Sequence, residues 1–374
     1  MLKVKSLPIL AVFGLLSACT PKTDTGPQII VINEAHFTTV PLEKVLAASE
    51  FIPLEFKPES ALSEFATFIN WTSGFYLMDL YKKKMVLQFD KQGRFVRTIG
   101  IAGQGPGEYN QMAEALVTKK GVEILCGGSS TQVFKYDQEG RYMLTEKILD
   151  KSSSSFGINP ENGDYYFYGA SNKNLIWQVK AKSLQPVDSF VLRNPNIMTP
   201  GVQAFSATAL GSVLFYQPFD DRIFELNGKG IRLKYRFDVG PSTPKYDELD
   251  TETQNKMVNE QELWFIYKAL ENSKWLYLLV AQQVAMDETQ SQFYSLIMDK
   301  KTGKIYSLPD TPEPGPLFRP AFALDEDNIL YSAVQPALVY ESVEWKAEFQ
   351  KKNLPLTADG NYVVVKISLD KIVQ

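Results

Sequence analysis

Short strands of alternating apolar and polar residues, separated by polar turns, repeat along most of the chain. In the clearest copy, a strand at 85–90 leads through a turn at 91–93 to a second strand at 94–99. Five similar hairpins follow, and the equivalent positions are Asp90, Asp137, Lys180, Asn227, Asp299 and Asp370. These positions are 47, 43, 47, 72 and 71 residues apart. A period of about 40–50 residues with several strands per unit is typical of β-propeller blades.

Further strands precede the hairpins and complete each unit. In the first unit they lie at 65–71 and 75–80, separated by a short polar turn. A single four-stranded sheet cannot bury both of its faces, whereas sheets packed face to face around an axis cover one another. The pattern therefore predicts an all-β fold, a six-bladed β-propeller with four-stranded blades, as one domain over residues 28–374.

Two polar segments and one apolar run depart from the repeat. Residues 242–261 and 343–352 are rich in charge and lack period-2 alternation, so we expect small helical or loop inserts in blades 5 and 6. The sixth unit has no outer strand after Asp370, while the apolar residues 29–33 belong to no unit. We expect this N-terminal strand to pair with the last blade and close the ring, because that pairing removes an exposed sheet edge.

The first 27 residues have the pattern of an export signal followed by a tether. Two lysines, an apolar run at 7–16 and small residues before Cys19 predict a signal peptide over residues 1–18. The run is shorter than the roughly 20 residues of a membrane span. The string Leu16-Ser17-Ala18-Cys19 resembles the bacterial lipobox, which implies a lipid on Cys19 and a tether over residues 19–27. An ordinary cleaved signal with an incidental cysteine is the alternative.

The composition argues against several classes of function. The chain has 39 Lys and Arg against 43 Asp and Glu, so its net charge of −4 makes a nucleic-acid partner unexpected. Once Cys19 is lipidated, Cys126 is the remaining cysteine, and its apolar strand predicts that it is buried. His36 is the single histidine, which excludes His-rich zinc sites and makes a Ser-His-Asp site improbable. We expect no cofactor.

A glycine-rich loop follows the first hairpin. Its sequence is Gly103-Gln104-Gly105-Pro106-Gly107-Glu108-Tyr109. It resembles the loop of the six-bladed β-propeller lipoproteins of Bacteroidota, and residues 51–55 and 221–226 are similar to two strands of that family. The resemblance extends from about residue 28 to the end of the chain. It implies the propeller fold and an exported lipoprotein, but no established activity and no catalytic residues.

The same loop differs from a phosphate-binding loop. A Walker-type loop needs Gly-Lys-Ser or Gly-Lys-Thr and a following helix, whereas Pro106 and Gly107 stand in those places. We expect the three glycines of the loop to permit positive φ in a tight crossover between blades, stiffened by Pro106. Glu108 and Tyr109 would then fasten the loop to the next blade.

The favoured hypothesis for function is binding rather than catalysis. Loops at one face of the propeller would hold a glycan, a peptide or an envelope protein, with the chain a lipid-anchored monomer. The outer membrane is favoured because Thr20, rather than aspartate, follows Cys19. Trp71 or Trp177 would suit sugar stacking, although a core position is equally consistent with each. The candidate ligand-face residues are Gln104, Glu108, Tyr109, Asp220, Asp221, Arg222 and Arg319.

The alternative is a carboxylate- or calcium-dependent enzyme of the hydrolase or lactonase type. Some six-bladed propellers are enzymes, and a fold alone does not decide function. The visible acid clusters are Asp220–Asp221 and residues 325–327. The second cluster lies between two strands, where Asp and Asn favour turns. No catalytic set is visible in the sequence, so we expect a protein that is not an enzyme.

Overall fold

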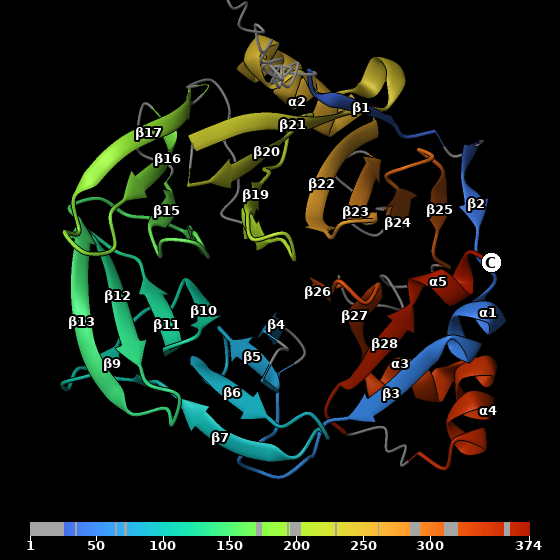
Figure 1. Ribbon diagram of the computed structural model, residues 1–374, viewed down its shortest axis with the longest axis horizontal. Helices are drawn as coiled ribbons and strands as arrows, with labels where there is room; N and C mark the ends of the chain where they lie inside the picture. Colours follow the sequence, from blue (N-terminus) through green and yellow to red (C-terminus); the bar gives the residue numbers. More distant parts are fainter. Residues whose placement is uncertain are drawn as a thin grey trace, which may run out of the picture.

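The protein forms a ring of blades around a central axis, as the repeat predicts (Figure 1). The computed structural model describes residues 26–33, 36–63, 66–70, 73–169, 174–192, 194, 203–228, 230–260, 262–284, 292–309, 321–354 and 360–374. Within these ranges the strands form six sheets of four or five strands and one two-stranded ladder. The predicted signal peptide with Cys19, and also Trp71 and Arg319, lie outside the described residues.

In each of the first three blades, the chain runs from the axis outward in antiparallel steps (Figure 1). Blade 1 contains β4 (Thr67–Asn70), β5 (Phe75–Asp79), β6 (Met85–Phe89) and β7 (Phe95–Ile99). Blade 2 contains β10 (Glu114–Thr118), β11 (Gly121–Cys126), β12 (Thr131–Tyr136) and β13 (Tyr142–Leu149). Blade 3 contains β14 (Ser155–Ile158), β15 (Tyr165–Tyr168), β16 (Asn174–Val179) and β17 (Pro186–Leu192).

The remaining three blades each include a strand from the N-terminal segment. Blade 4 contains β18 (Phe205–Ala207), β19 (Val213–Phe215), β20 (Arg222–Asn227), β21 (Gly230–Asp238) and, outermost, β1 (Gln28–Val31). Blade 5 contains β22 (Glu262–Glu271), β23 (Trp275–Val284), β24 (Gln292–Asp299), β25 (Ile305–Ser307) and β2 (Thr38–Thr39). Blade 6 contains β26 (Ala323–Leu324), β27 (Ile329–Val334), β28 (Val363–Ser368) and β3 (Ser49–Pro53).

Alternate residues of one strand serve two different interfaces between blades. In β5, Phe75 and Leu77 pack in a cluster shared with blade 6, whereas Tyr76 and Met78 pack in a cluster shared with blade 2. Each of the six hydrophobic clusters found among the described residues lies between two neighbouring blades. The ring therefore has no single core, and every blade depends on both of its neighbours.

The N-terminal segment first follows the outside of the ring and then closes the ring. β1 and β2 pair in parallel with β21 and β25, and β3, after helix α1 (Leu42–Ala47), pairs antiparallel with β28. An N-terminal strand thus closes the ring, but the prediction that residues 29–33 form it is wrong. Ile30 and Ile32 are buried between blades 4 and 5 instead, and Phe51 of β3 is buried in the cluster of blades 5 and 6.

Both predicted inserts are largely helical. The first contains η2 (Gly240–Ser242), η3 (Tyr246–Glu248) and α2 (Thr251–Glu260), between blades 4 and 5. The second contains α3 (Pro336–Glu341) and α4 (Val343–Lys351), and α5 (Leu369–Ile372) follows the last strand. The Ser342 hydroxyl caps α4 by accepting a hydrogen bond from the Trp345 amide. In the ranges that the structure covers, none of these helices is long and apolar enough to cross a bilayer.

Candidate functional site

The glycine-rich loop at 103–109 is folded on itself. It lies between two short parallel strands, β8 (Ile101–Ala102) and β9 (Glu108–Tyr109), at the outside of the ring (Figure 1). The Glu108 carboxylate accepts a hydrogen bond from the Gly105 amide at 2.8 Å. Gln104 is exposed. Glu108, a predicted ligand-face residue, therefore serves the loop itself.

The glycines of this loop have different surroundings and backbone conformations. Gly107 has φ of +77°, as expected, and a Cβ there would lie 2.6 Å from the Tyr142 ring. Gly103 and Gly105 do not adopt the left-handed region, so that part of the prediction is wrong. A Cβ on Gly103 would instead lie 2.0 Å from a carboxylate oxygen of Glu108. A side chain at Gly103 would therefore displace this carboxylate from its hydrogen bond with the Gly105 amide.

Tyr109 fastens the loop between blades 1 and 2, as predicted. Its side chain is buried, and its ring centroid lies 5.6 Å from that of Phe134 in blade 2. Its hydroxyl donates a hydrogen bond of 2.8 Å to the carbonyl of Lys84 in blade 1. Lys84 has φ of +52°, a conformation that is uncommon for a residue with a Cβ. Tyr109 thus holds a strained turn of blade 1 in place.

This turn borders an open groove of about 350 Å³, which we call the crossover groove. The groove lies where the β5–β6 and β11–β12 turns meet the connections that lead into blades 2 and 3. Its lining residues are Leu80, Lys84, Asn110, Gln111, Met112, Ala113, Gly127, Gly128, Ser152, Ser153 and Ser154. None of the predicted ligand-face residues is among them. The sequence signal for the groove was the position of Asn110 and Gln111 directly after the glycine-rich loop.

The groove is lined by apolar side chains, by uncharged polar groups and by Lys84. Within the described part of the chain, the side chains of Asn110, Gln111 and Ser152 make no hydrogen bond, and all three are exposed. Ser153, by contrast, is buried, with its hydroxyl 2.9 Å from that of Thr131. The wall is therefore held by the fold, while three polar side chains are available to a ligand.

A buried acid is adjacent in sequence to the lining residues of the groove. Glu114 follows the lining residue Ala113, and its carboxylate accepts hydrogen bonds from the Ser155 hydroxyl (2.8 Å) and the Phe156 amide (2.7 Å). Burial raises the pKa of Glu114 to about 7, although these hydrogen bonds oppose the rise. Glu114 thus joins the groove walls of blades 2 and 3 through a group that titrates near neutral pH.

This titration predicts how stability depends on pH. Because the pKa of Glu114 is higher in the folded than in the unfolded chain, its contribution to stability is present at low pH and is lost as pH rises through about 7. We expect Glu114→Gln to flatten the decline of the free energy of unfolding between about pH 5 and 8. Denaturant unfolding at several pH values measures this. Parallel profiles for both proteins would contradict it.

The predicted charged patch at residues 220–222 is buried and paired. Asp220 accepts hydrogen bonds from Gln217 (2.9 Å) and from the Arg222 guanidinium (2.7 Å), which also binds Asp247 of the insert at 2.7 Å. Burial alone would lower the pKa of the Arg222 guanidinium, but the hydrogen bond and the charge of Asp220 outweigh burial and raise this pKa. The Arg222 guanidinium also lies 5.3 Å from the Tyr246 ring centroid. This cluster ties the first insert to blade 4.

Asp221 lies at a second groove, which we call the rim groove. The groove measures about 580 Å³ and lies between β1, β21 and the first insert. Asp221 forms an ion pair with Arg236, and both residues line it. This carboxylate is therefore neutralised by its neighbour, although Asp238, Asp247 and Glu248 also line the groove.

The remaining candidates have structural roles where they are described. The Asp325 carboxylate accepts a hydrogen bond from the Ile329 amide at 2.8 Å, so this acid forms a turn as expected. Cys126 is buried, and burial raises the pKa of its thiol to about 12. The Lys151 ammonium lies 4.6 Å from the Trp177 ring centroid and covers that ring. Within the described ranges, no three His, Cys, Asp or Glu side chains are grouped closely enough to hold a metal ion.

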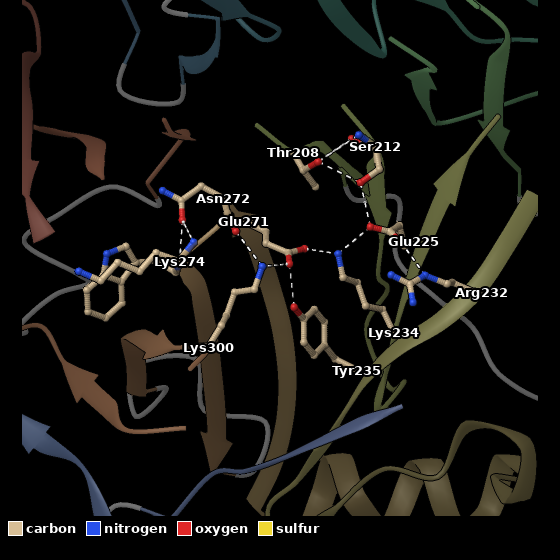
Figure 2. A network of polar contacts seen from close by, with 11 residues as sticks. Thr208, Ser212, Glu225, Arg232, Lys234, Tyr235, Glu271, Asn272, Lys274 and Lys300 are labelled. Atoms are coloured by element: carbon tan, nitrogen blue, oxygen red, sulfur yellow. Dashed lines mark hydrogen bonds and ion pairs between the residues drawn. The ribbon is translucent and has the colours of Figure 1, made fainter. Parts of the chain in front are cut away.

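A buried ionic network on the opposite face links blades 4 and 5 (Figure 2). Lys234 bridges Glu225 and Glu271 with contacts of 2.6 and 2.7 Å, and Lys300 binds Glu271 at 2.5 Å. Burial alone would raise the pKa of Glu225, but hydrogen bonds from Lys234 and Arg232 outweigh it and hold this pKa below its usual value. The network was not visible in the sequence, because its members come from three strands and a turn.

Comparison with solved structures supports the fold. The chain is similar to the crystal structure of a Bacteroides fragilis protein described as exported, with a TM-score of 0.64 and 14% identity over 91% of this chain and 99% of that one. This likeness concerns the fold alone. The chain is also similar to a protein of unknown function from Bacteroides thetaiotaomicron, with a TM-score of 0.45 and 10% identity over 86% of this chain and 76% of that one. An inactive virginiamycin B lyase from Staphylococcus aureus, solved with quinupristin, has a TM-score of 0.47 and 9% identity, over 85% of this chain and 99% of that one. The last two likenesses carry no functional argument.

Sequence comparison assigns the family. No curated protein matches the chain. The family model described as "Domain of unknown function (DUF4934)" matches residues 27–368, which include every blade of the ring. The chain therefore belongs to the DUF4934 family, and its fold is a six-bladed β-propeller.

Proposed function

We propose that the protein is an exported, lipid-anchored propeller that binds a polar ligand, such as a glycan, in its crossover groove without transforming it. The observation that carries this proposal is the state of the polar side chains. Asn110, Gln111 and Ser152 of the groove are exposed and uncommitted in the described part of the chain. Asp220 and Asp221, in contrast, are engaged by arginines.

The position of the N-terminal segment supports an accessible groove. β1 begins at Gln28 on the outer edge of blade 4, across the ring from blade 1 (Figure 1). A tether of residues 19–27 spans at most about 30 Å, so a lipid on Cys19 would hold the rim of blade 4 near the membrane. The crossover groove, which borders blades 1 to 3, would then face away from the bilayer. An envelope location also agrees with the exported neighbour from Bacteroides fragilis.

The test is a ligand screen with a blocked groove. The full mature chain, purified in detergent, is screened against an array of glycans and envelope peptides, and the melting temperature reports binding. We expect a ligand that stabilises the wild type and the control variant Ser183→Trp, on an exposed turn of the opposite face, but not Ser152→Trp. Equal stabilisation of Ser152→Trp would place the site elsewhere. Conversion of the ligand, detected by mass spectrometry, would favour an enzyme.

A further inference from the structure

We infer that the outward face of β1 rests on the lipid bilayer through the side chains of Ile29 and Val31, so that this edge of blade 4 is a membrane-contact surface. The inference rests on the lipid anchor proposed above, and it adds how the anchored ring meets the bilayer. The surface that covers these side chains is the bilayer itself rather than a single lipid headgroup.

The outward face of β1 is aliphatic, whereas the solvent-facing side of a strand is normally polar. Ile30 is buried between blades 4 and 5, so the alternation of side chains places Ile29 and Val31 on the other face of the strand. Their exposed fractions are 54% and 51%. Successive side chains on one face of a strand are about 7 Å apart, so these two form one aliphatic strip.

The second strand that the N-terminal segment adds to the ring shows that strand pairing does not require this strip. Like β1, β2 pairs in parallel with the outer strand of a blade (Figure 1). It exposes Thr38 and Thr39, and threonine is both β-branched and polar, as suits a solvated strand. The exposed isoleucine and valine of β1 therefore need a reason other than pairing with blade 4.

The sequence position of β1 identifies the bilayer as the surface that covers the strip. Of the large apolar side chains that are exposed in the described ranges, Ile29 and Val31 are the nearest in sequence to Cys19. A tether of residues 19–27 spans at most about 30 Å, so a lipid on Cys19 holds β1 within that distance of the bilayer. Because tethering raises the local concentration of the strip at the lipid surface, a contact of two side chains suffices.

The charges beside the strip favour an apolar contact over an electrostatic one. Ile29 lines the rim groove together with four acids, of which two are paired with arginines. The other two, Asp238 and Glu248, stand against one lysine, Lys245. These lining residues therefore lack the excess of lysine and arginine that attracts a protein to anionic headgroups. Burial of the two aliphatic side chains is the source of the contact.

The test measures contact with lipid in the anchored protein. The full mature chain is purified with its lipid, which mass spectrometry verifies, and is inserted into vesicles of phosphatidylethanolamine and phosphatidylglycerol with brominated acyl chains. Val31→Cys and the control Val96→Cys are each labelled with the same fluorophore. Val96 is 39% exposed on β7, the outer strand of blade 1 on the other side of the ring. The native Cys126 is buried and takes no label.

We expect the bromines to quench the Val31 label at least about threefold more strongly than the Val96 label, because an interfacial contact lies about 5–10 Å inside the boundary of headgroups and acyl chains. Adding Ile29→Thr, which gives β1 the residue type that β2 exposes, should reduce this quenching. Added salt should leave it unchanged, since the contact is apolar.

The possible failures are distinguishable. A lipidated chain whose Val31 label is quenched no more than its Val96 label would refute the contact and leave the anchor in place. Quenching of the Val31 label that Ile29→Thr does not reduce would also refute the contact. A mature chain without lipid on Cys19 would refute the anchor of the proposed function and, with it, this contact.

Discussion

A chain that starts at Leu54 is expected not to fold into the ring, whereas a chain that starts at Thr38 should fold with reduced stability. The first lacks β3, the outer strand of blade 6. Phe51 of that strand lies 5.6 Å and 5.1 Å, between ring centroids, from Trp345 and Phe349 of α4. Its loss exposes the edge of β28 and removes Ile52 from the cluster between the last and first blades. The cost is comparable with the whole free energy of unfolding of a natural domain, about 5–15 kcal/mol.

The longer truncated chain is the control. It lacks β1 and with it the buried Ile30 and Ile32, which contribute about 1.5–3 kcal/mol each before the cost of ordering the segment is subtracted. Circular dichroism and denaturant unfolding measure both effects. A cooperative transition at the wild-type midpoint in the chain that starts at Leu54 would contradict closure by β3. An absence of folding in the chain that starts at Thr38 would show that β1 has the larger role.

The sequence was sufficient for the blades but not for the identity of the closing strand. The hairpin repeat predicts the ring because period-2 alternation and turn residues are local signals. Residues 29–33 are almost wholly apolar, whereas residues 49–53 contain Ser49 and Glu50, so the apolar pattern favoured the wrong segment. Long-range packing determines which segment closes the ring. Ile30 packs between blades 4 and 5, and Phe51 packs against α4. A segment that runs around three blades leaves no local signature of where it pairs.

The candidate site was predicted only in part, for a related reason. The glycine-rich loop was identified, but its Tyr109 hydroxyl binds the backbone of Lys84 rather than a ligand. In a sequence, a side chain that bonds to distant backbone cannot be told from one that bonds to a ligand. The crossover groove brings together Lys84, Asn110 and Ser152 from turns around three blades. Their proximity follows from the geometry of the ring, which residue patterns along one blade do not contain.

Glu271→Ala is expected to lower the free energy of unfolding by about 3–5 kcal/mol, because it removes the central acid of the network in Figure 2. The Glu271 side chain is fully buried, at 0% exposure, and binds Lys234 at 2.7 Å and Lys300 at 2.5 Å. Its loss leaves two largely buried ammonium groups with one fewer counter-charge, and also frees the Tyr235 hydroxyl that donates to it at 2.8 Å. A cation that loses its partner in a buried site lowers the free energy of unfolding much more than an exposed cation does.

Two further variants separate this burial effect from the loss of any ion pair. Glu139→Ala breaks an exposed pair with Arg141 of 3.1 Å and should cost less than about 1 kcal/mol. Combining Glu271→Ala with Lys300→Met should recover part of the loss, since one of the unpaired cations is then absent. Urea unfolding of these variants, of Lys300→Met alone and of the wild type measures the coupling. If Glu271→Ala cost no more than Glu139→Ala, the network would contribute nothing to holding blades 4 and 5 together, and the ring would depend on its hydrophobic clusters alone.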